Sequence, residues 1–187
     1  MTSWALSPQH RTKLLALARE AISHFIRTAE RLAPSSDGDA ILAEKRGVFV
    51  SLHQGENLRG CVGITEPMLS LQDAVITSAY NAAFSDDRFE PLTQQELPKT
   101  EIEISCLTPA QPIDDIKKIV LGRHGILLEK GRAKGVFLPQ VAPQEGWDLP
   151  TTLSHLAVKA GLPADGWKKD CAISVFEAIV LSEKDCA

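Results

Sequence analysis

The chain has few cysteines, no basic excess and no long apolar run, and each absence excludes a class of protein. Its four cysteines occur singly among 187 residues, without the CxxC or CxxH spacing of zinc sites, and they are too few for a disulfide-rich scaffold. The formal net charge of −4 provides no general attraction for nucleic acid or anionic lipid. No apolar stretch approaches the ~18 residues of a membrane-spanning helix, and the N-terminus lacks the pattern of a secretory signal. We therefore expect a cytoplasmic protein with reduced thiols that does not enter a membrane.

The motifs of nucleotide and metal enzymes are also missing. Neither GxxxxGK[ST] nor GxGxxG occurs, and the five histidines are far apart, without HExxH-like spacing. The sequence thus predicts no metal site and identifies no cofactor. Basic residues gather at 122–125 and 130–135; they could contact phosphate, but basic residues at hairpin tips more often serve solubility.

The hydrophobic pattern predicts an α+β protein. Apolar residues at spacings of three and four predict a helix from Pro8 to about Leu32, stopped by Ala33-Pro34. Because most connections are short, we expect a mixed, largely antiparallel sheet packed by helices. The other expected elements are hairpins at 47–53/57–64 and 126–130/135–141, helices at 69–84 and 149–160, and strands at 101–107 and 172–181.

The stretch from Asn57 to Ile64 is the most informative part of the chain. Leu58, Val62 and Ile64 point to one side of the expected strand, and Arg59 and Cys61 point to the other. Two glycines interrupt it, which indicates a bulge or a close approach of another backbone. Keeping the apolar faces together predicts the cross-strand pairs His53–Asn57, Leu52–Leu58, Ser51–Arg59, Val50–Gly60, Phe49–Cys61 and Val48–Val62.

Cys61 is the first candidate for chemistry. Arg59, two residues away on the same face, could lower the pKa of the thiol and make Cys61 a nucleophile, or could contact a substrate. A free cysteine can equally be a small buried packing residue. The expected register separates Cys61 from His53 by four residues, about 13 Å, too far for a nucleophile–base pair. A base would then have to be His124, His155, Asp86 or Asp87.

A second candidate is the stretch Asp86-Asp87-Arg88-Phe89. Its charged side chains could hold a polar ligand, although a helix end with internal ion pairs is the more common explanation. Two adjacent carboxylates are weak evidence for Mg²⁺. The sequence therefore predicts a ligand-binding face with contributions from Arg59, Ser51, Asp87 and Arg88.

Several short stretches, in this order, carry a family resemblance: 47–52 (GVFVSL), 58–63 (LRGCVG), 87–92 (DRFEPL), 138–141 (LPQV) and 159–162 (KAGL). They resemble the AMMECR-type domain, also called AmmeMemoRadiSam system protein A, over about residues 10–182. The resemblance implies one domain spanning residues 1–187, divided into a larger and a smaller lobe with a cleft between them.

The resemblance also implies association with a Memo-like protein and a radical SAM protein. Two functions follow as hypotheses. The chain is either a binding component that presents a substrate or partner to those proteins, or an enzyme that uses Cys61 as a nucleophile or transfer thiol. RNA binding is a third hypothesis, which the acidic balance and the lack of a basic, aromatic-interleaved face disfavour.

Overall fold

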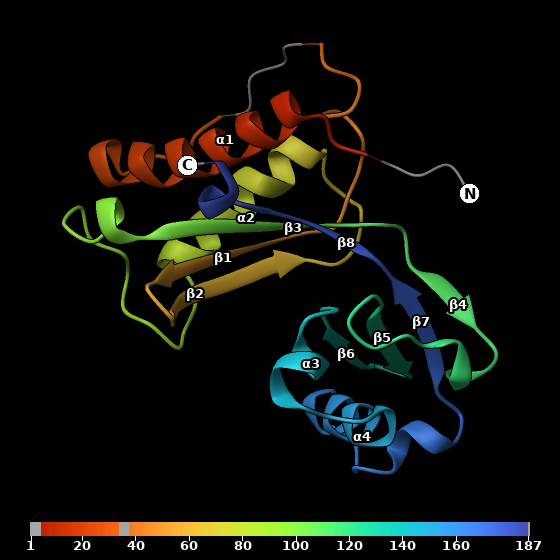
Figure 1. Ribbon diagram of the computed structural model, residues 1–187. Helices are drawn as coiled ribbons and strands as arrows, with labels where there is room; N and C mark the ends of the chain where they lie inside the picture. Colours follow the sequence, from red (N-terminus) through yellow and green to blue (C-terminus); the bar gives the residue numbers. More distant parts are fainter. Residues whose placement is uncertain (1–4, 34–37, 187) are drawn as a thin grey trace. The chain divides into compact units, whose positions relative to one another are not determined.

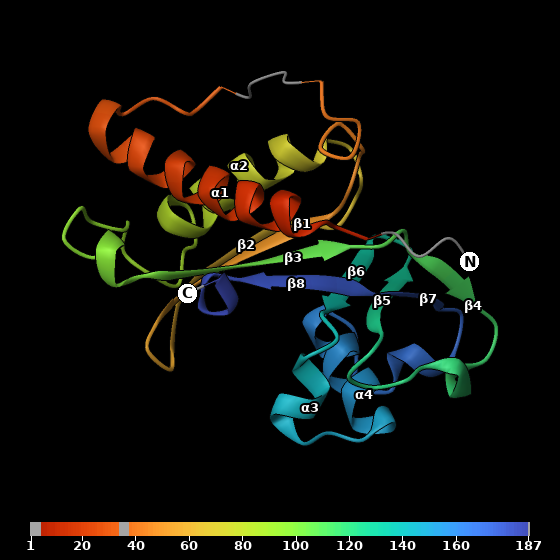
Figure 2. The ribbon, with the colours of Figure 1, turned by 45° about the horizontal axis from the view of Figure 1, so that its top comes forward.

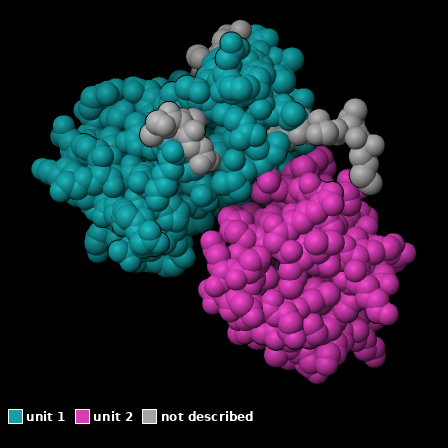
Figure 3. All heavy atoms as spheres, in the orientation of Figure 1, with its two compact units in different colours: residues 1–107, 179–187 teal, residues 108–178 magenta. Residues whose placement is uncertain are grey.

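The computed structural model describes residues 5–33 and 38–186 (Figure 1). The chain divides into two compact units, one formed by residues 1–107 and 179–187 and the other by residues 108–178 (Figure 3). Helices and antiparallel strand pairs occur in both, which confirms the α+β class, although the strands form two sheets instead of one. The cleft between two lobes stays a prediction.

Two helices cover one face of the first unit's sheet. Helix α1 (Pro8–Thr28) begins after Ser7, whose hydroxyl accepts from the His10 amide. It ends earlier than predicted because Ala29 adopts a left-handed conformation, with φ of 58°, and turns the chain. Helix α2 (Leu71–Phe84) is capped by Ser70. Both helices lie on the same side of the strands in Figures 1 and 2.

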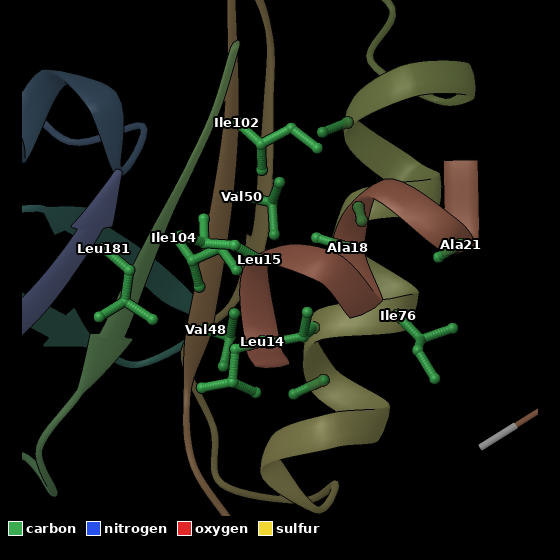
Figure 4. Packing of buried hydrophobic residues seen from close by; sticks show 14 of the residues in the cluster. Leu14, Leu15, Ala18, Ala21, Val48, Val50, Ile76, Ile102, Ile104 and Leu181 are labelled. Atoms are coloured by element: carbon green, nitrogen blue, oxygen red, sulfur yellow. The ribbon is translucent and has the colours of Figure 1, made fainter. Parts of the chain in front are cut away.

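The sheet beneath them has the order β2-β1-β3-β8, so β2 is an edge strand. Its strands are β1 (Val48–Gln54), β2 (Asn57–Ile64), β3 (Glu101–Leu107) and β8 (Ala178–Ser182). Alternate residues of β1 and β3 are fully buried under the helices, as predicted for Ile102, Ile104 and Cys106. Figure 4 shows Val48 and Val50 of β1 packing with Ile102, Ile104 and Leu181 against Leu14, Leu15 and Ala18 of α1.

The predicted register of the first hairpin is wrong by two residues. Cys61 lies opposite Ser51, not Phe49, and Gly63 lies opposite Phe49. A bulge between Leu52 and His53 absorbs the difference at the turn. Because a shift of two preserves the side to which each residue points, the assignment of faces holds for residues 60–64. It is wrong for Leu58, which the bulge places opposite His53 instead of Leu52 and which is 39% exposed.

The second unit has a four-stranded sheet in the order β4-β7-β5-β6. Its core lies between this sheet and α4 and includes Ile126, Leu128, Leu153 and Leu156. The strands are β4 (Gln111–Ile113), β5 (Gly125–Lys130), β6 (Ala133–Phe137) and β7 (Ala172–Phe176), and the helices are α3 (Val141–Glu145) and α4 (Leu149–Lys159). Single 3₁₀ turns occur at Ile116–Lys118 and Gly166–Lys168 here, and at Leu97–Lys99 and Glu183–Cys186 in the first unit.

The predicted strand 172–181 is two strands, β7 and β8, which belong to different sheets. The break falls at Glu177, whose backbone pairs with Thr108 instead of with a neighbouring strand. The Thr108 amide donates to the Glu177 carbonyl at 2.8 Å, and the Glu177 amide donates to the Thr108 hydroxyl at 2.8 Å. Thr108 and Glu177 therefore lie at the two places where the chain passes between the units.

Candidate functional site

Each glycine of the stretch 58–63 makes room for a particular neighbour. A Cβ atom at Gly60 would lie 2.1 Å from the carbonyl oxygen of Ala82, so its absence lets α2 lie directly on β2. A Cβ atom at Gly63 would lie 2.3 Å from the ring of Phe49, on the opposite face of the hairpin. These glycines hold β2 between a helix backbone and an aromatic ring, and Cys61 lies between them in the sequence.

The thiol of Cys61 lies beside a hydroxyl group. Ser51, its cross-strand neighbour, is buried and donates a hydrogen bond to the sulfur across 3.3 Å. The observed register also removes the distance argument against His53, which is two residues from Ser51 along β1, about 7 Å, instead of four. The hydrogen-bond donor at the sulfur is nevertheless Ser51.

The backbone of Cys61 is held from outside the sheet by Asp86 and Arg88. The Cys61 amide donates to Oδ2 of Asp86 at 2.8 Å, and Nη2 of Arg88 donates to the Cys61 carbonyl at 3.3 Å. At an edge strand these groups would otherwise be available to another strand. The carboxylate and guanidinium therefore take the place of a neighbouring strand at this one residue.

Asp86 and Arg88 also hold each other. Nε and Nη2 of Arg88 donate to the two carboxylate oxygens of Asp86 at 2.9 and 2.7 Å. Hydrogen bonds from the Arg88 side chain, and then from the Cys61 amide, outweigh burial and lower the pKa of Asp86 to about 2. The side chain of Asp86 is 7% exposed, whereas that of Arg88 is 57% exposed. Arg88 thus presents a fixed positive charge beside Cys61, with its guanidinium 5.3 Å from the centre of the Phe89 ring.

Arg59 is bound within the first unit. Its Nε donates to Glu96 at 2.9 Å and its Nη2 to the Glu90 carbonyl at 2.9 Å, and its side chain is only 14% exposed. The same Glu96 carboxylate accepts from the amide and hydroxyl of Thr93, and the first of these bonds is one half of the capping box that the spacing Thr-x-x-Glu at 93–96 favours. The hydrogen bond from Arg59 is the main reason why the pKa of Glu96 falls to about 2.

The structure therefore brings together Ser51, Cys61 and Arg88 of the predicted site residues. Asp87 is exposed and takes no part in the hydrogen bonds around Cys61. Its neighbour Asp86 accepts from the Cys61 amide instead. The sequence alone could not decide which of the two carboxylates does so. The sequence did not identify Glu96 as a site residue, and the signal for it was the spacing of Thr93 and Glu96, whose carboxylate accepts from the Thr93 amide.

The other candidate bases and cations have local partners in the second unit. Nδ1 of His124 accepts from the Val120 amide at 3.1 Å, and the ring of His155 stacks on Trp147 with 4.0 Å between centroids. The cations of the basic tips include Arg123, which pairs with Glu177, and Lys134, which pairs with Glu129. These contacts favour the solvated-loop interpretation of both tips.

Cys106 and Cys171 provide a contrast to Cys61. Cys106 is fully buried, and burial raises the pKa of its thiol to about 12. Burial also raises the pKa of Cys171. Within residues 5–33 and 38–186, no three histidine, cysteine or acidic side chains are grouped so as to hold a metal ion. No helix in the same ranges combines the length and apolar character needed to cross a bilayer.

Comparison with known proteins identifies the family. The AMMECR1 family model matches residues 15–181. A protein of Methanopyrus kandleri is 42% identical over 182 residues, covering 92% of this chain and 87% of its own. A protein of Thermofilum pendens is 39% identical over 179 residues, covering 87% of this chain and 84% of its own. The crystal structure of an uncharacterised protein from Pyrococcus horikoshii matches with a TM-score of 0.85 at 37% identity, covering 90% of this chain and 88% of that one. The chain belongs to the AMMECR1 family.

Proposed function

We propose that this chain is a binding component of a modification pathway and acts together with a Memo-like protein and a radical SAM protein. Its recognition surface is formed by Ser51, Cys61 and Arg88, and it holds an acidic group of a substrate or partner. The observation that carries this proposal is the contrast between Cys61, whose sulfur accepts its hydrogen bond in the described chain from the neutral hydroxyl of Ser51, and Arg88, whose charge is fixed and exposed.

A catalytic thiol needs a base or a strongly favoured thiolate. The hydrogen bond at the Cys61 sulfur comes from Ser51, a neutral hydroxyl. Asp86 is close, but its carboxylate accepts from the Cys61 backbone amide and from Arg88. A general base works best with a pKa near the working pH, and the pKa of Asp86 is about 2. These contacts support a positioning role for Asp86.

Arg88 has the properties of a recognition residue. Asp86 fixes its orientation through Nε and Nη2, and no partner of its Nη1 is found in the part of the chain that the structure describes. A guanidinium held in this way has little conformational freedom left to lose. Binding a carboxylate or phosphate therefore costs less conformational entropy. Phe89 beneath it adds an apolar surface for the rest of the ligand.

The alternative function is an enzyme that uses Cys61 as a nucleophile or transfer thiol. The observation in its favour is that the thiol is partly exposed and close to the positive charge of Arg88. This alternative predicts that Cys61 is essential for pathway activity and becomes covalently modified.

A binding titration with the purified Memo-like protein, repeated with the radical SAM protein, tests the proposal. Cys61→Ser should leave the affinity within about twofold, while Arg88→Ala should weaken it by about tenfold or more, because one charged hydrogen bond typically contributes ~1.5–3 kcal/mol. Arg27→Ala is the matched control: Arg27 lies in the same unit, is 56% exposed and pairs with Glu20. Loss of binding in Cys61→Ser with full binding in Arg88→Ala would overturn the proposal.

A further inference from the structure

A second cluster of polar side chains in the first unit, which shares no residue with the Cys61 surface, joins the start of α1 to the segment that follows residue 38. The Ser7 hydroxyl lies 2.9 Å from Nδ1 of His10. Nε2 of the same ring lies 3.2 Å from Oδ2 of Asp39. Figures 1 and 2 show the orange segment after residue 38 near the end of α1 where the helix begins. A hydroxyl, an imidazole and a carboxylate are therefore connected in that order.

The contacts of the His10 ring determine which of its nitrogens carries the proton. Because the Asp39 carboxylate only accepts, Nε2 donates to it. Nδ1 then has the free lone pair, and it accepts from the Ser7 amide at 3.3 Å. The Ser7 hydroxyl donates to the same nitrogen, as a nucleophilic hydroxyl does to its general base. Asp39 thus positions His10 as a base toward Ser7.

Both ends of this cluster are attached to the core. Leu6, which precedes Ser7, is 5% exposed, and Leu42 is 1% exposed. Oδ1 of Asp39 accepts from the amides of Ile41 and Leu42 at 2.9 and 3.3 Å, which fixes the orientation of the carboxylate. Ser7 itself is exposed, so a substrate can reach its hydroxyl.

Part of the cluster also caps α1. The Ser7 oxygen accepts from the His10 amide at 3.2 Å, which is the ordinary bond of a serine at a helix start. A cap alone does not need a carboxylate on the far nitrogen of the histidine. The amide at the Ser7 oxygen also suits a reactive hydroxyl, because a hydrogen bond to an ionised oxygen is stronger than one to a neutral oxygen.

We propose that Ser7 is a nucleophile that hydrolyses carboxylic esters, with His10 as its general base. The Ser7 oxygen attacks the carbonyl carbon while its proton passes to Nδ1 of His10. That proton then goes to the alcohol oxygen as the bond between acyl carbon and alcohol oxygen breaks, which leaves an ester on Ser7. Water, deprotonated by His10, cleaves this ester and restores the serine. Ser7 and His10 are the catalytic residues, and Asp39 is a positioning residue.

Labelling of the full chain with an alkyl fluorophosphonate tests this activity. The oxygen of an activated serine forms a bond to phosphorus, and fluoride leaves with the serine proton. Peptide mass spectrometry should find the label on Ser7 and not on Ser23, which lies on the same helix beside the Glu20 carboxylate. His10→Gln should slow the labelling by about 10²-fold or more, as expected for the loss of a general base. An unlabelled Ser7 in the wild type would overturn the proposal and leave the cluster as a helix cap.

Two further variants separate catalysis from capping. Ser7→Gly removes the hydroxyl but keeps a residue that suits a helix start, so the melting temperature should change little. The wild type should hydrolyse p-nitrophenyl acetate faster than this variant, and equal rates would contradict the ester assignment.

Asp39→Asn should slow the labelling of Ser7 by about tenfold or more, because an amide can hold the histidine in the wrong tautomer. Asp73→Asn is the matched control: Asp73 contacts Ser70 at the start of α2 through its carboxylate, and its replacement should leave the labelling of Ser7 unchanged. An unchanged labelling rate in Asp39→Asn would contradict the positioning role. None of these measurements involves Cys61 or Arg88, so their failure is independent of the proposed function.

Discussion

The carboxylate of Asp86 should contribute to the free energy of unfolding by an amount that depends on pH. Its pKa is lowered from 3.8 to about 2 by Arg88 and by the Cys61 amide. A lowering of ~1.8 units corresponds to about 2 kcal/mol of unfolding free energy. Since the folded-state pKa is depressed, this stability is present above about pH 4 and is lost as the pH falls through about 2, with about 1 kcal/mol lost by pH ~3.

Asp86→Asn removes this titration while keeping an oxygen for the Cys61 amide. Urea unfolding at several pH values measures the difference in free energy between wild type and variant. That difference should be about 2 kcal/mol at neutral pH and should shrink toward zero in acid. Asp87→Asn is the matched control, because Asp87 is the exposed neighbour outside the hydrogen bonds of the site. A difference that does not change with pH, or an equal effect of Asp87→Asn, would refute the reasoning.

Three further outcomes are expected. Gly60→Ala should lower the unfolding free energy by about 2 kcal/mol or more in chemical denaturation, because its Cβ would meet a backbone carbonyl of α2 at 2.1 Å. In the native protein, iodoacetamide should modify Cys61 faster than Cys106, whose burial raises its pKa to about 12; peptide mass spectrometry measures the two rates. Glu183→Gln should lower the melting temperature, because Glu183 accepts from Nε and Nη2 of Arg19 at 2.7 and 2.6 Å and joins α1 to the C-terminal segment.

Each of these outcomes has a control. Gly55→Ala introduces a Cβ that meets no atom within 4 Å, at a φ of 61°, and should cost only about 1 kcal/mol; an equal loss at both glycines would contradict the packing argument. Equal labelling rates of the two cysteines in the folded state would contradict the burial of Cys106. An unchanged melting temperature in Glu183→Gln would show that the Arg19 pair adds nothing to stability.

The first hairpin shows how far the sequence could lead. Alternation of apolar residues separated the core face from the face that carries Ser51 and Cys61, except at Leu58, which lies opposite His53 and is exposed. It could not determine which residues pair, because a slip of two positions leaves every side chain on its face. The bulge at Leu52/His53 depends on the three-dimensional turn, and the pairing of Cys61 with Ser51 follows from it.

Asp86 and Glu96 show a second limit. Two adjacent aspartates look equivalent in a sequence, and the backbone after α2 decides that Asp86 turns inward while Asp87 stays in solvent. The local bond between Thr93 and Glu96 could be predicted from their spacing. The bond from Glu96 to Arg59 spans 37 positions and depends on the packing of the whole unit.

The most direct test of the proposed binding role is the chemical state of Cys61 after coexpression with the Memo-like and radical SAM proteins. The complex is isolated, and the peptide that contains Cys61 is analysed by mass spectrometry without reductant. The binding role predicts an unmodified thiol together with a stable complex that Cys61→Ser also forms. A covalent adduct at Cys61, formed in the presence of the partners and absent without them, would contradict it and support the transfer-thiol alternative.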